Sequence, residues 1–335
     1  MKKKKKSPNE VSTLRVYAGI DGGGTKTDAA IISEHGDILA VASGSATNPH
    51  SVPPQEAITE LLRILDLLFS SRMDYLSHCE SICLGMSGIA EDKEREWITT
   101  HVHDYMIKKK NSAGNSSTCA VWVVTEGEIA LMAALGQPHG LLAISGTGSI
   151  IYGITPEGKV HRTGGWGHLL GDEGSGYRIG QRTLQAVMQS HDGMLPPTVL
   201  TSLVQHELHI RHVPDLKHLV YQPDWTKSST ASMARLTIEA ASAGDKTASA
   251  ILMDEARQLA NTAQALIRQC VSFYTAPMAL SGSIFRHSAL FRDTFVQQLH
   301  DIYDSQQVVY LEDAPAPAVG AAQLARHKRH LAESS

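Results

Sequence analysis

The segment 21–27, Asp-Gly-Gly-Gly-Thr-Lys-Thr, is the first candidate for chemistry, and it follows a short apolar run at 15–20. Glycines let the backbone approach a phosphate closely and turn several N–H groups toward it. The Thr hydroxyls and the Lys ammonium add donors and a positive charge, and Asp21 can hold Mg²⁺ directly or through water. Three consecutive glycines exceed what a two-residue hairpin requires. The segment predicts a phosphate site made of Gly22, Gly23, Gly24, Thr25 and Lys26.

A similar strand–turn–strand pattern recurs in the second half of the chain, where Ser-Gly-Thr-Gly-Ser (145–149) separates two apolar runs. Alone this turn is a weak indicator, but as a duplicate of the first it predicts two similar α/β halves, each offering one loop of backbone N–H groups. Gly146, Thr147 and Gly148 are therefore predicted to bind a nucleotide. Both loops join strands rather than open a helix, which excludes the Walker A and Rossmann patterns.

The segment 163–180 contains seven glycines in 18 residues, more than a regular helix or strand would hold. Trp166 offers a flat apolar face of the kind on which sugars stack. Asp172 and Glu173 offer acceptors for hydroxyl groups. A merely flexible loop would not be expected to combine these residue types, so we interpret the segment as a sugar site.

Two acidic residues, Glu126 and Glu128, follow the apolar run 120–124. The carboxyl ends of strands in open α/β sheets are where sites form, and a carboxylate there could accept a proton from a substrate hydroxyl. The alternative is a pair of acids that complement a helix dipole. The residues alone do not decide between the two. The run 279–285, Ala-Leu-Ser-Gly-Ser-Ile-Phe, is likewise either a base or ribose contact or a simple strand and turn.

Length and composition set the frame that must position these residues. The chain has 335 residues, which corresponds to about two domains. It has 42% hydrophobic and 19% charged residues, as globular enzymes do, and a net charge of −4 that excludes a strongly basic nucleic-acid binder. No apolar run is long enough for a membrane span. The four cysteines lack zinc spacing and suit buried, reduced thiols in a cytoplasmic protein.

Helices and strands alternate along the chain after the first residues. The lysine-rich start, residues 1–12, is predicted to be a disordered leader, with a basic arm for RNA or anionic lipid as the alternative. The runs 81–85, 120–124, 277–280 and 307–311 are expected to be strands. The segment 209–229 is polar and is expected to be a loop. Helices are expected at 54–72, 91–108, 128–135, 176–189, 232–243, 246–272, 288–300 and 317–330.

Taken with their order, these motifs resemble the actin-like ATPase superfamily of sugar kinases, and within it the N-acetylglucosamine kinase branch grouped with the BadF/BadG/BcrA/BcrD ATPases. Residues 19–27 and 144–149 resemble its two phosphate motifs, and 279–283 its adenosine motif. Residues 164–175 resemble the sugar-binding signature of N-acetylglucosamine kinases, and residues 317–321 the second connecting helix.

The resemblance implies a duplicated actin-like (ribonuclease H-like) α/β fold, with two domains, 13–138 and 139–335, around a nucleotide cleft. The last helix, 317–330, is a candidate to pack back on the N-terminal domain. The implied reaction is ATP- and Mg²⁺-dependent phosphorylation of N-acetylglucosamine at its 6-hydroxyl in the cytoplasm, by a homodimer without nucleic-acid or membrane partners. Glucosamine or N-acetylmuramic acid as substrate, and a non-catalytic sugar sensor or a partner-driving ATPase, are the alternatives.

The resemblance also assigns roles to individual residues. Glu126 stands where the family usually has an Asp as catalytic base, so the carboxylate here is one methylene longer. Asp21 joins it as a catalytic and metal-binding residue, and Gly282 and Ser283 are expected at the adenosine. The expected sugar contacts are Asn48, Thr147, Ser149, Gly165, Trp166 and Asp172.

Overall fold

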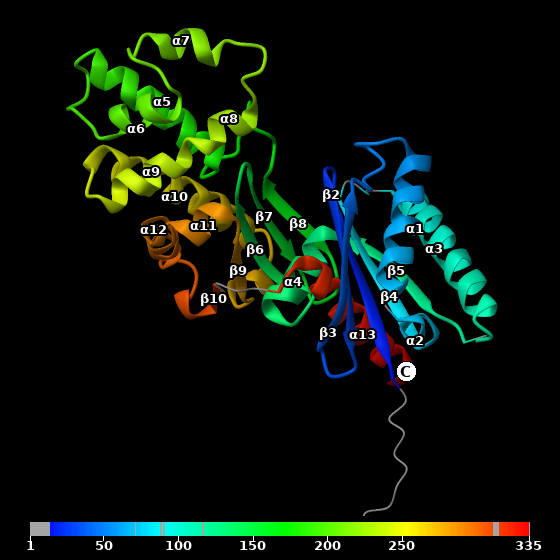
Figure 1. Cartoon of the computed structure of the whole chain (residues 1–335). Coiled ribbons are helices and arrows are strands. Elements are labelled where there is room, and N and C mark those ends of the chain that lie inside the picture. The colour runs from blue at the N-terminus through cyan, green and yellow to red at the C-terminus, as the bar shows by residue number, and fades with distance from the viewer. Residues whose placement is uncertain are drawn as a thin grey trace, which may run out of the picture. The chain divides into compact units, whose positions relative to one another are not determined.

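The computed structural model describes residues 14–70, 72–87, 89, 91–115, 117–310 and 315–334. The chain divides into two compact units: the first ends at Pro138 and is completed by the residues from Pro315 onward, and the second comprises His139–Ala314 (Figure 1). The predicted leader at 1–12 lies outside the described residues. None of the described helices is long and apolar enough to cross a membrane.

The first unit is built on a five-stranded sheet in the order β3-β2-β1-β4-β5. The strands are β1 (Val16–Gly22), β2 (Lys26–Ser33), β3 (Ile38–Ser45), β4 (Cys79–Met86) and β5 (Ala120–Thr125). β1 is antiparallel to β2 and parallel to β4, and β5 is parallel to β4. β1 and β4 are buried almost throughout, as continuous apolar strands inside an α/β unit must be. The carboxyl ends of β1, β4 and β5 therefore meet at one edge of the sheet.

Helices cover both faces of this sheet (Figure 1). One face carries α1 (Pro54–Ser70), α2 (Met73–Ser77) and α3 (Asp92–Ser112), and the other carries α4 (Glu126–Leu135) and α13 (Pro317–Ser334). α13 approaches β1 so closely that a Cβ on Gly19 would lie 2.1 Å from the backbone nitrogen of Ala322. The last helix thus belongs to the first unit, and the second unit ends near residue 314 rather than at 335.

The second unit repeats the same sheet. Its strands are β6 (Gly140–Ser145), β7 (Ser149–Ile154), β8 (Val160–Gly164), β9 (Met278–Ser281) and β10 (Val308–Val309). Their order is β8-β7-β6-β9-β10, with an antiparallel pair at each of β6–β7 and β7–β8 and parallel pairs at β6–β9 and β9–β10. This order matches that of the first sheet strand for strand. The duplication predicted from the two glycine turns is confirmed.

The second unit differs from the first in the helices inserted between β8 and β9. They are α5 (Gly176–His191), α6 (Leu200–Glu207), α7 (Asp215–Val220), α8 (Lys227–Ser232), α9 (Ala234–Ser242) and α10 (Lys246–Ile267), with a 3₁₀ turn at Val271–Tyr274. After β9 come α11 (Ser283–His287), α12 (Ala289–Leu299) and a 3₁₀ turn at Ser305–Gln307. α5 to α9 gather at one end of the second sheet (Figure 1).

The expectation of a loop at 209–229 is wrong. The segment contains α7 and the start of α8, both six residues long. α8 forms because Thr226 caps it. The Thr226 hydroxyl accepts a hydrogen bond from the Ser229 amide at 3.2 Å, and the Ser229 hydroxyl accepts one from the Thr226 amide at 3.1 Å. A buried Leu216 anchors α7 to the core. Short helices that depend on a cap and one anchor leave little apolar periodicity in a sequence.

Candidate active site

The first glycine turn joins β1 to β2 and is fixed by backbone hydrogen bonds. The Gly23 amide donates to the Lys26 carbonyl at 3.1 Å, and the Gly23 carbonyl accepts from the amides of Thr47 and Asn48. The amides of Gly24 and Thr25 donate to no other described residue, so they are available to an anion. The Lys26 ammonium, which lies 2.9 Å from the Asp28 carboxylate, is well exposed. The predicted phosphate residues are thus together in one ordered turn.

Asn48, which is predicted to contact the sugar, is held beside this turn. Its residue is buried, and its side-chain oxygen accepts a hydrogen bond from the His50 amide at 2.8 Å. The buried hydroxyls of Thr27 and Thr47, 2.8 Å apart, tie the start of β2 to the segment that follows β3. The side-chain amide of Asn48 is therefore presented from a rigid support.

Asp21 and Glu126 lie at the same edge of the first sheet. The register aligns Asp21 with Gly85 of β4 and Gly85 with Val124 of β5, two residues before Glu126. The pKa of Asp21 is raised from 3.8 to about 6, mainly by burial and then by the Glu126 and Asp28 carboxylates, while Lys26 acts in the opposite direction. A carboxylate with a raised pKa at a strand end is suited to hold a proton or a cation.

The two acids after β5 both begin α4. Glu128 completes a capping box: its carboxylate accepts from the Thr125 amide at 2.8 Å, and the Thr125 hydroxyl accepts from the Glu128 amide. Glu126 is the first residue of α4, so the helix begins two residues earlier than expected. The Glu126 carboxylate is close enough to raise the pKa of Asp21 by charge repulsion. Both acids lie in the first turn of α4, where they complement the helix dipole, and Glu128 caps the helix as well; a role of Glu126 as the base stays a prediction.

Asp21 is the residue predicted to hold a cation. A positive ion would relieve the repulsion between the Asp21 and Glu126 carboxylates. Among the described residues, no group of three or more His, Cys, Asp or Glu side chains could hold a metal ion. The residues fit Mg²⁺ as one protein carboxylate whose other ligands come from phosphate oxygens and water.

In the second unit, the glycine turn is fastened to the glycine-rich segment. The Ser145 hydroxyl donates to the Gly174 carbonyl at 2.6 Å, and the Ser149 hydroxyl donates to the Glu173 carbonyl at 2.7 Å. The Gly146 carbonyl accepts from the Gly176 amide at 2.7 Å. Ser149, predicted to contact the sugar, thus donates its hydroxyl hydrogen to a bond within the protein, and its oxygen can still accept a hydrogen bond.

A cavity of about 590 Å³ opens beside this turn. Gly146, Thr147 and Ser283, all predicted from the sequence, line it. The amides of Thr147 and Gly148 donate to no other described residue. Gly282 has φ +104°, and a Cβ there would lie 2.2 Å from the Ser145 carbonyl oxygen, so only glycine lets the end of β9 meet the turn.

The remaining wall of the cavity was missed by sequence reasoning. It is formed by residues of α5, α8, α9 and α11: Gly176, Ser228, Ala231, Ser232, Ala234, Arg235, Ile238, Glu239, Ile284 and His287. The Thr-Lys-Ser-Ser sequence at 226–229 is a capping box and was the available signal for α8.

The glycine-rich segment after β8 is held by two carboxylates. Asp172 is buried with φ +64°, an uncommon backbone conformation for a residue other than glycine, and its carboxylate lies 2.7 Å from the Lys227 ammonium. The buried Glu255 of α10 accepts from the Gly174 amide at 2.8 Å and pairs with Arg182. Lys227 and Glu255 were both missed. A Glu on the apolar face of α10 was a signal for the second of them.

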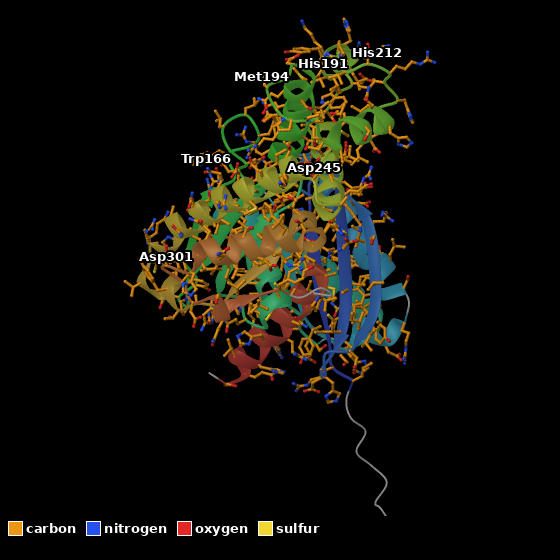
Figure 2. All side chains as sticks on the ribbon, turned by 90° about the vertical axis from the view of Figure 1, so that its left-hand side faces the viewer. Trp166, His191, Met194, His212, Asp245 and Asp301 are labelled. Carbon is orange, nitrogen blue, oxygen red and sulfur yellow. The ribbon has the colours of Figure 1, made fainter. Side chains whose placement is uncertain are left out.

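Trp166 lies on the same segment, away from the helical end marked by His191 and His212 (Figure 2). Its side chain is largely exposed, and the Arg162 guanidinium stacks over one face of the ring, 4.8 Å from its centre. Gly165 has φ +68°, and a Cβ there would lie 2.4 Å from Ile150. One face of the indole is thus occupied by an arginine, and the predicted stacking concerns the other.

Comparison with known proteins identifies relatives over nearly the whole chain. The model of the BadF/BadG/BcrA/BcrD ATPase family matches residues 18–325. The N-acetylmuramic acid/N-acetylglucosamine kinase of Clostridium acetobutylicum is 29% identical over 315 residues, 93% of this chain and 99% of that protein. The N-acetyl-D-glucosamine kinase of Dictyostelium discoideum is 29% identical over 327 residues, 94% and 98% of the two chains.

Solved structures show the same fold. A protein of Chromobacterium violaceum, to which N-acetylglucosamine kinase activity has been ascribed, has a TM-score of 0.60 at 27% identity, covering 93% of this chain and 99% of that one. A ROK family glucokinase from Streptomyces griseus, in complex with glucose and AMPPNP, has a TM-score of 0.52 at 17% identity, covering 94% and 99%. The chain therefore has the duplicated actin-like fold of the sugar kinases, as predicted.

The raised pKa of Asp21 predicts a pH-dependent cost to stability. The folded state binds this proton more tightly than the unfolded state, so the free energy of unfolding falls as pH rises from about 4 through about 6. Asp21→Asn removes that cost. In urea unfolding we expect the variant to be more stable than the wild type at pH 8, by up to about 3 kcal/mol, since each pKa unit is worth about 1.4 kcal/mol. The gain should vanish toward pH 4.

Asp104→Asn, at an exposed position on α3, is the matched control and should change stability by the same small amount at both pH values. An Asp21→Asn variant that is less stable than the wild type at pH 8 would contradict the placement of Asp21 beside Glu126.

Proposed function

Since the chain belongs to the BadF/BadG/BcrA/BcrD ATPase family, we propose that it is an ATP-dependent kinase that phosphorylates N-acetylglucosamine at the 6-hydroxyl. One observation carries the proposal. The turn 145–149 lines a cavity of nucleotide size, and it is also hydrogen-bonded to residues 164–175, which we call the sugar-signature segment. The names of the two 29% identical relatives, both N-acetylglucosamine kinases, support the same substrate.

The nucleotide is assigned to the second unit. Its adenosine occupies the cavity next to Gly282 and Ser283, and its phosphates meet the open amides of Thr147 and Gly148. Backbone N–H groups do not gain or lose protons near neutral pH, so their hydrogen bonds to phosphate are available throughout that range. The turn at Gly22–Lys26, with its own open amides and one ammonium, is the phosphate-binding element that we propose in the first unit.

The sugar is assigned to the signature segment and to Asn48. Trp166 and Gly165 provide an apolar edge, and the Asp172 carboxylate and the Ser149 and Thr147 oxygens provide acceptors for its hydroxyls. Asp172 uses one oxygen to pair with Lys227, which leaves the other for a hydroxyl group. Its left-handed backbone fits a residue that is constrained by a ligand rather than by its own preference.

The chemical step is an in-line transfer. The oxygen of the sugar hydroxyl forms a bond to the γ-phosphorus of ATP, the bond to the β,γ-bridging oxygen breaks, and ADP leaves with that electron pair. Glu126 accepts the hydroxyl proton as the general base. Mg²⁺ bound near Asp21 would offset charge on the phosphate oxygens.

Two further properties are part of the proposal. The four cysteines are free thiols, which together with ATP use suits the cytoplasm. A small-molecule amino sugar is the partner of the site, and a homodimer is the assembly we expect for the chain.

The first prediction concerns the substrate. With Mg²⁺ and ATP, ADP release in a coupled assay should be fastest with N-acetylglucosamine and slower with N-acetylmuramic acid and glucosamine, because N-acetylglucosamine is the substrate named for both 29% identical relatives. Glucosamine as the best substrate would replace the one proposed. ADP release at the same rate without sugar would favour an ATPase instead.

The second prediction concerns the base. Glu126→Gln keeps the size of the side chain and removes the proton acceptor, so kcat should fall by a factor of about 10²–10⁴ with the sugar KM little changed. Glu128→Gln is the matched control, since Gln also serves in a capping box, and it should retain most activity. Loss of turnover in Glu128→Gln with full turnover in Glu126→Gln would show that Glu126 is not the base.

The third prediction concerns the nucleotide turn. An ideal Cβ on Gly146 meets no atom within 4 Å, and its φ is not in the left-handed region. Gly146→Ala should therefore fold with unchanged or slightly raised stability. Because the methyl group would stand where a phosphate approaches, ATP affinity in calorimetry should fall at least about tenfold, a loss of about 1.4 kcal/mol. Unchanged affinity would take the turn out of the nucleotide site.

A further inference from the structure

Lys227 is the first residue of α8, and its side chain leaves the helix toward the sugar-signature segment. Its ammonium lies 2.7 Å from the Asp172 carboxylate, whose side chain is 4% exposed, while the Lys227 side chain itself is 33% exposed. A buried carboxylate requires a partner of opposite charge. The pairing explains why Asp172 is tolerated in the interior, but it does not explain why the cation remains partly open.

The same ammonium lies over the second glycine turn. A Cβ built on Gly148 would be 3.2 Å from the Lys227 nitrogen and 3.0 Å from the nearer Asp172 oxygen. Both charged groups are thus in contact distance of the turn whose amides are open. Glycine at 148 keeps this space free.

Lys227 directly precedes the residues of α8 that line the cavity. Its next neighbour in α8, Ser228, lines the cavity wall, as do Ala231 and Ser232 one turn further on. The cavity contains one arginine, Arg235, whose guanidinium is already paired with Glu207 at 2.7 Å and Glu239 at 3.6 Å. Lys227 has three N–H donors, and its ammonium makes one hydrogen bond within the part of the chain that the structure describes, to Asp172.

These positions place a cation with donors to spare next to a phosphate-binding turn, and we propose that Lys227 is a catalytic residue whose ammonium contacts the γ-phosphoryl group of ATP. The inference rests on the proposed kinase function. Charge on the transferring group is spread over its three outer oxygens in the transition state, and a cation already held in place stabilises that charge without rearranging. Asp172 holds the ammonium with one carboxylate oxygen and receives the sugar with the other.

The competing account is that Lys227 does no more than neutralise Asp172. The two accounts differ in which ligand is lost when the charge is removed. A γ-phosphate contact makes binding of a triphosphate depend on Lys227 and leaves a diphosphate almost unaffected. Neutralisation of Asp172 alone makes sugar binding depend on Lys227 and leaves both nucleotides unaffected.

The experiment measures three affinities of Lys227→Met by calorimetry: for a magnesium complex of a non-hydrolysable ATP analogue, for Mg-ADP and for N-acetylglucosamine. We expect the analogue to bind at least about tenfold more weakly than to the wild type, because hydrogen bonds to charged groups are among the strongest in proteins. We expect ADP to change by less than about threefold, and kcat to fall about 10²–10³-fold. Lys227→Arg, which keeps the charge, should recover part of the analogue affinity.

Lys217→Met, an exposed lysine on α7, is the matched control and should leave all three affinities unchanged. Melting temperatures show whether each variant is folded. Equal weakening of the analogue and ADP, weakening of the sugar alone, or no change would overturn the assignment of Lys227. A wild type that binds neither nucleotide would overturn the proposed function itself, so the two failures are distinguishable.

Discussion

Four hydrogen bonds between the turn 145–149 and the segment 173–177 hold the site of the second unit together. Two are donated by the side chains of Ser145 and Ser149, and two by the backbone amides of Gly176 and Tyr177. Because the two hydroxyls are buried, breaking either bond would leave an unpaired polar group in the interior. The turn that lines the nucleotide cavity and the sugar-signature segment are therefore held rigidly together, although β7 and β8 separate them along the chain.

The two halves have kept the same strand order and diverged in what their first strands present. The penultimate residue of β1 is an acid, Asp21, whose pKa is raised by burial and by Glu126. The corresponding strand β6 ends in a neutral hydroxyl, Ser145, that is used up in holding the backbone. In the kinase we propose, the first unit supplies Asp21 and Glu126, and the second supplies backbone N–H donors, the Lys227 ammonium and a cavity. In our account of the kinase, the duplication provides two phosphate-binding turns, and this divergence gives them different tasks.

The sequence was sufficient where function depends on backbone geometry. Gly165, Gly282 and the glycine-rich segment 163–180 are visible in a sequence because other residue types are strained at such positive-φ positions. Glu126 could be placed at the sheet edge because strand ends in parallel sheets align.

Residues whose role depends on a distant partner could not be found in this way. Lys227 and Glu255 act on the signature segment from α8 and α10, and nothing in their own neighbourhoods names Asp172 or the Gly174 amide as the partner. The cavity wall was missed for a related reason: α8 is six residues long and is fixed by a cap and by packing, not by periodicity. The close approach of α13 to Gly19 likewise joins residues from opposite ends of the chain.

The central claim, transfer of a phosphoryl group from ATP to an amino-sugar hydroxyl, is tested most directly by ³¹P NMR of the full chain with Mg-ATP and N-acetylglucosamine. The account predicts a phosphomonoester signal, coupled to the protons on carbon 6 of the sugar, that grows in equal amount with ADP. Formation of ADP and inorganic phosphate in equal amounts, with no sugar phosphate and no dependence on the sugar, would contradict it.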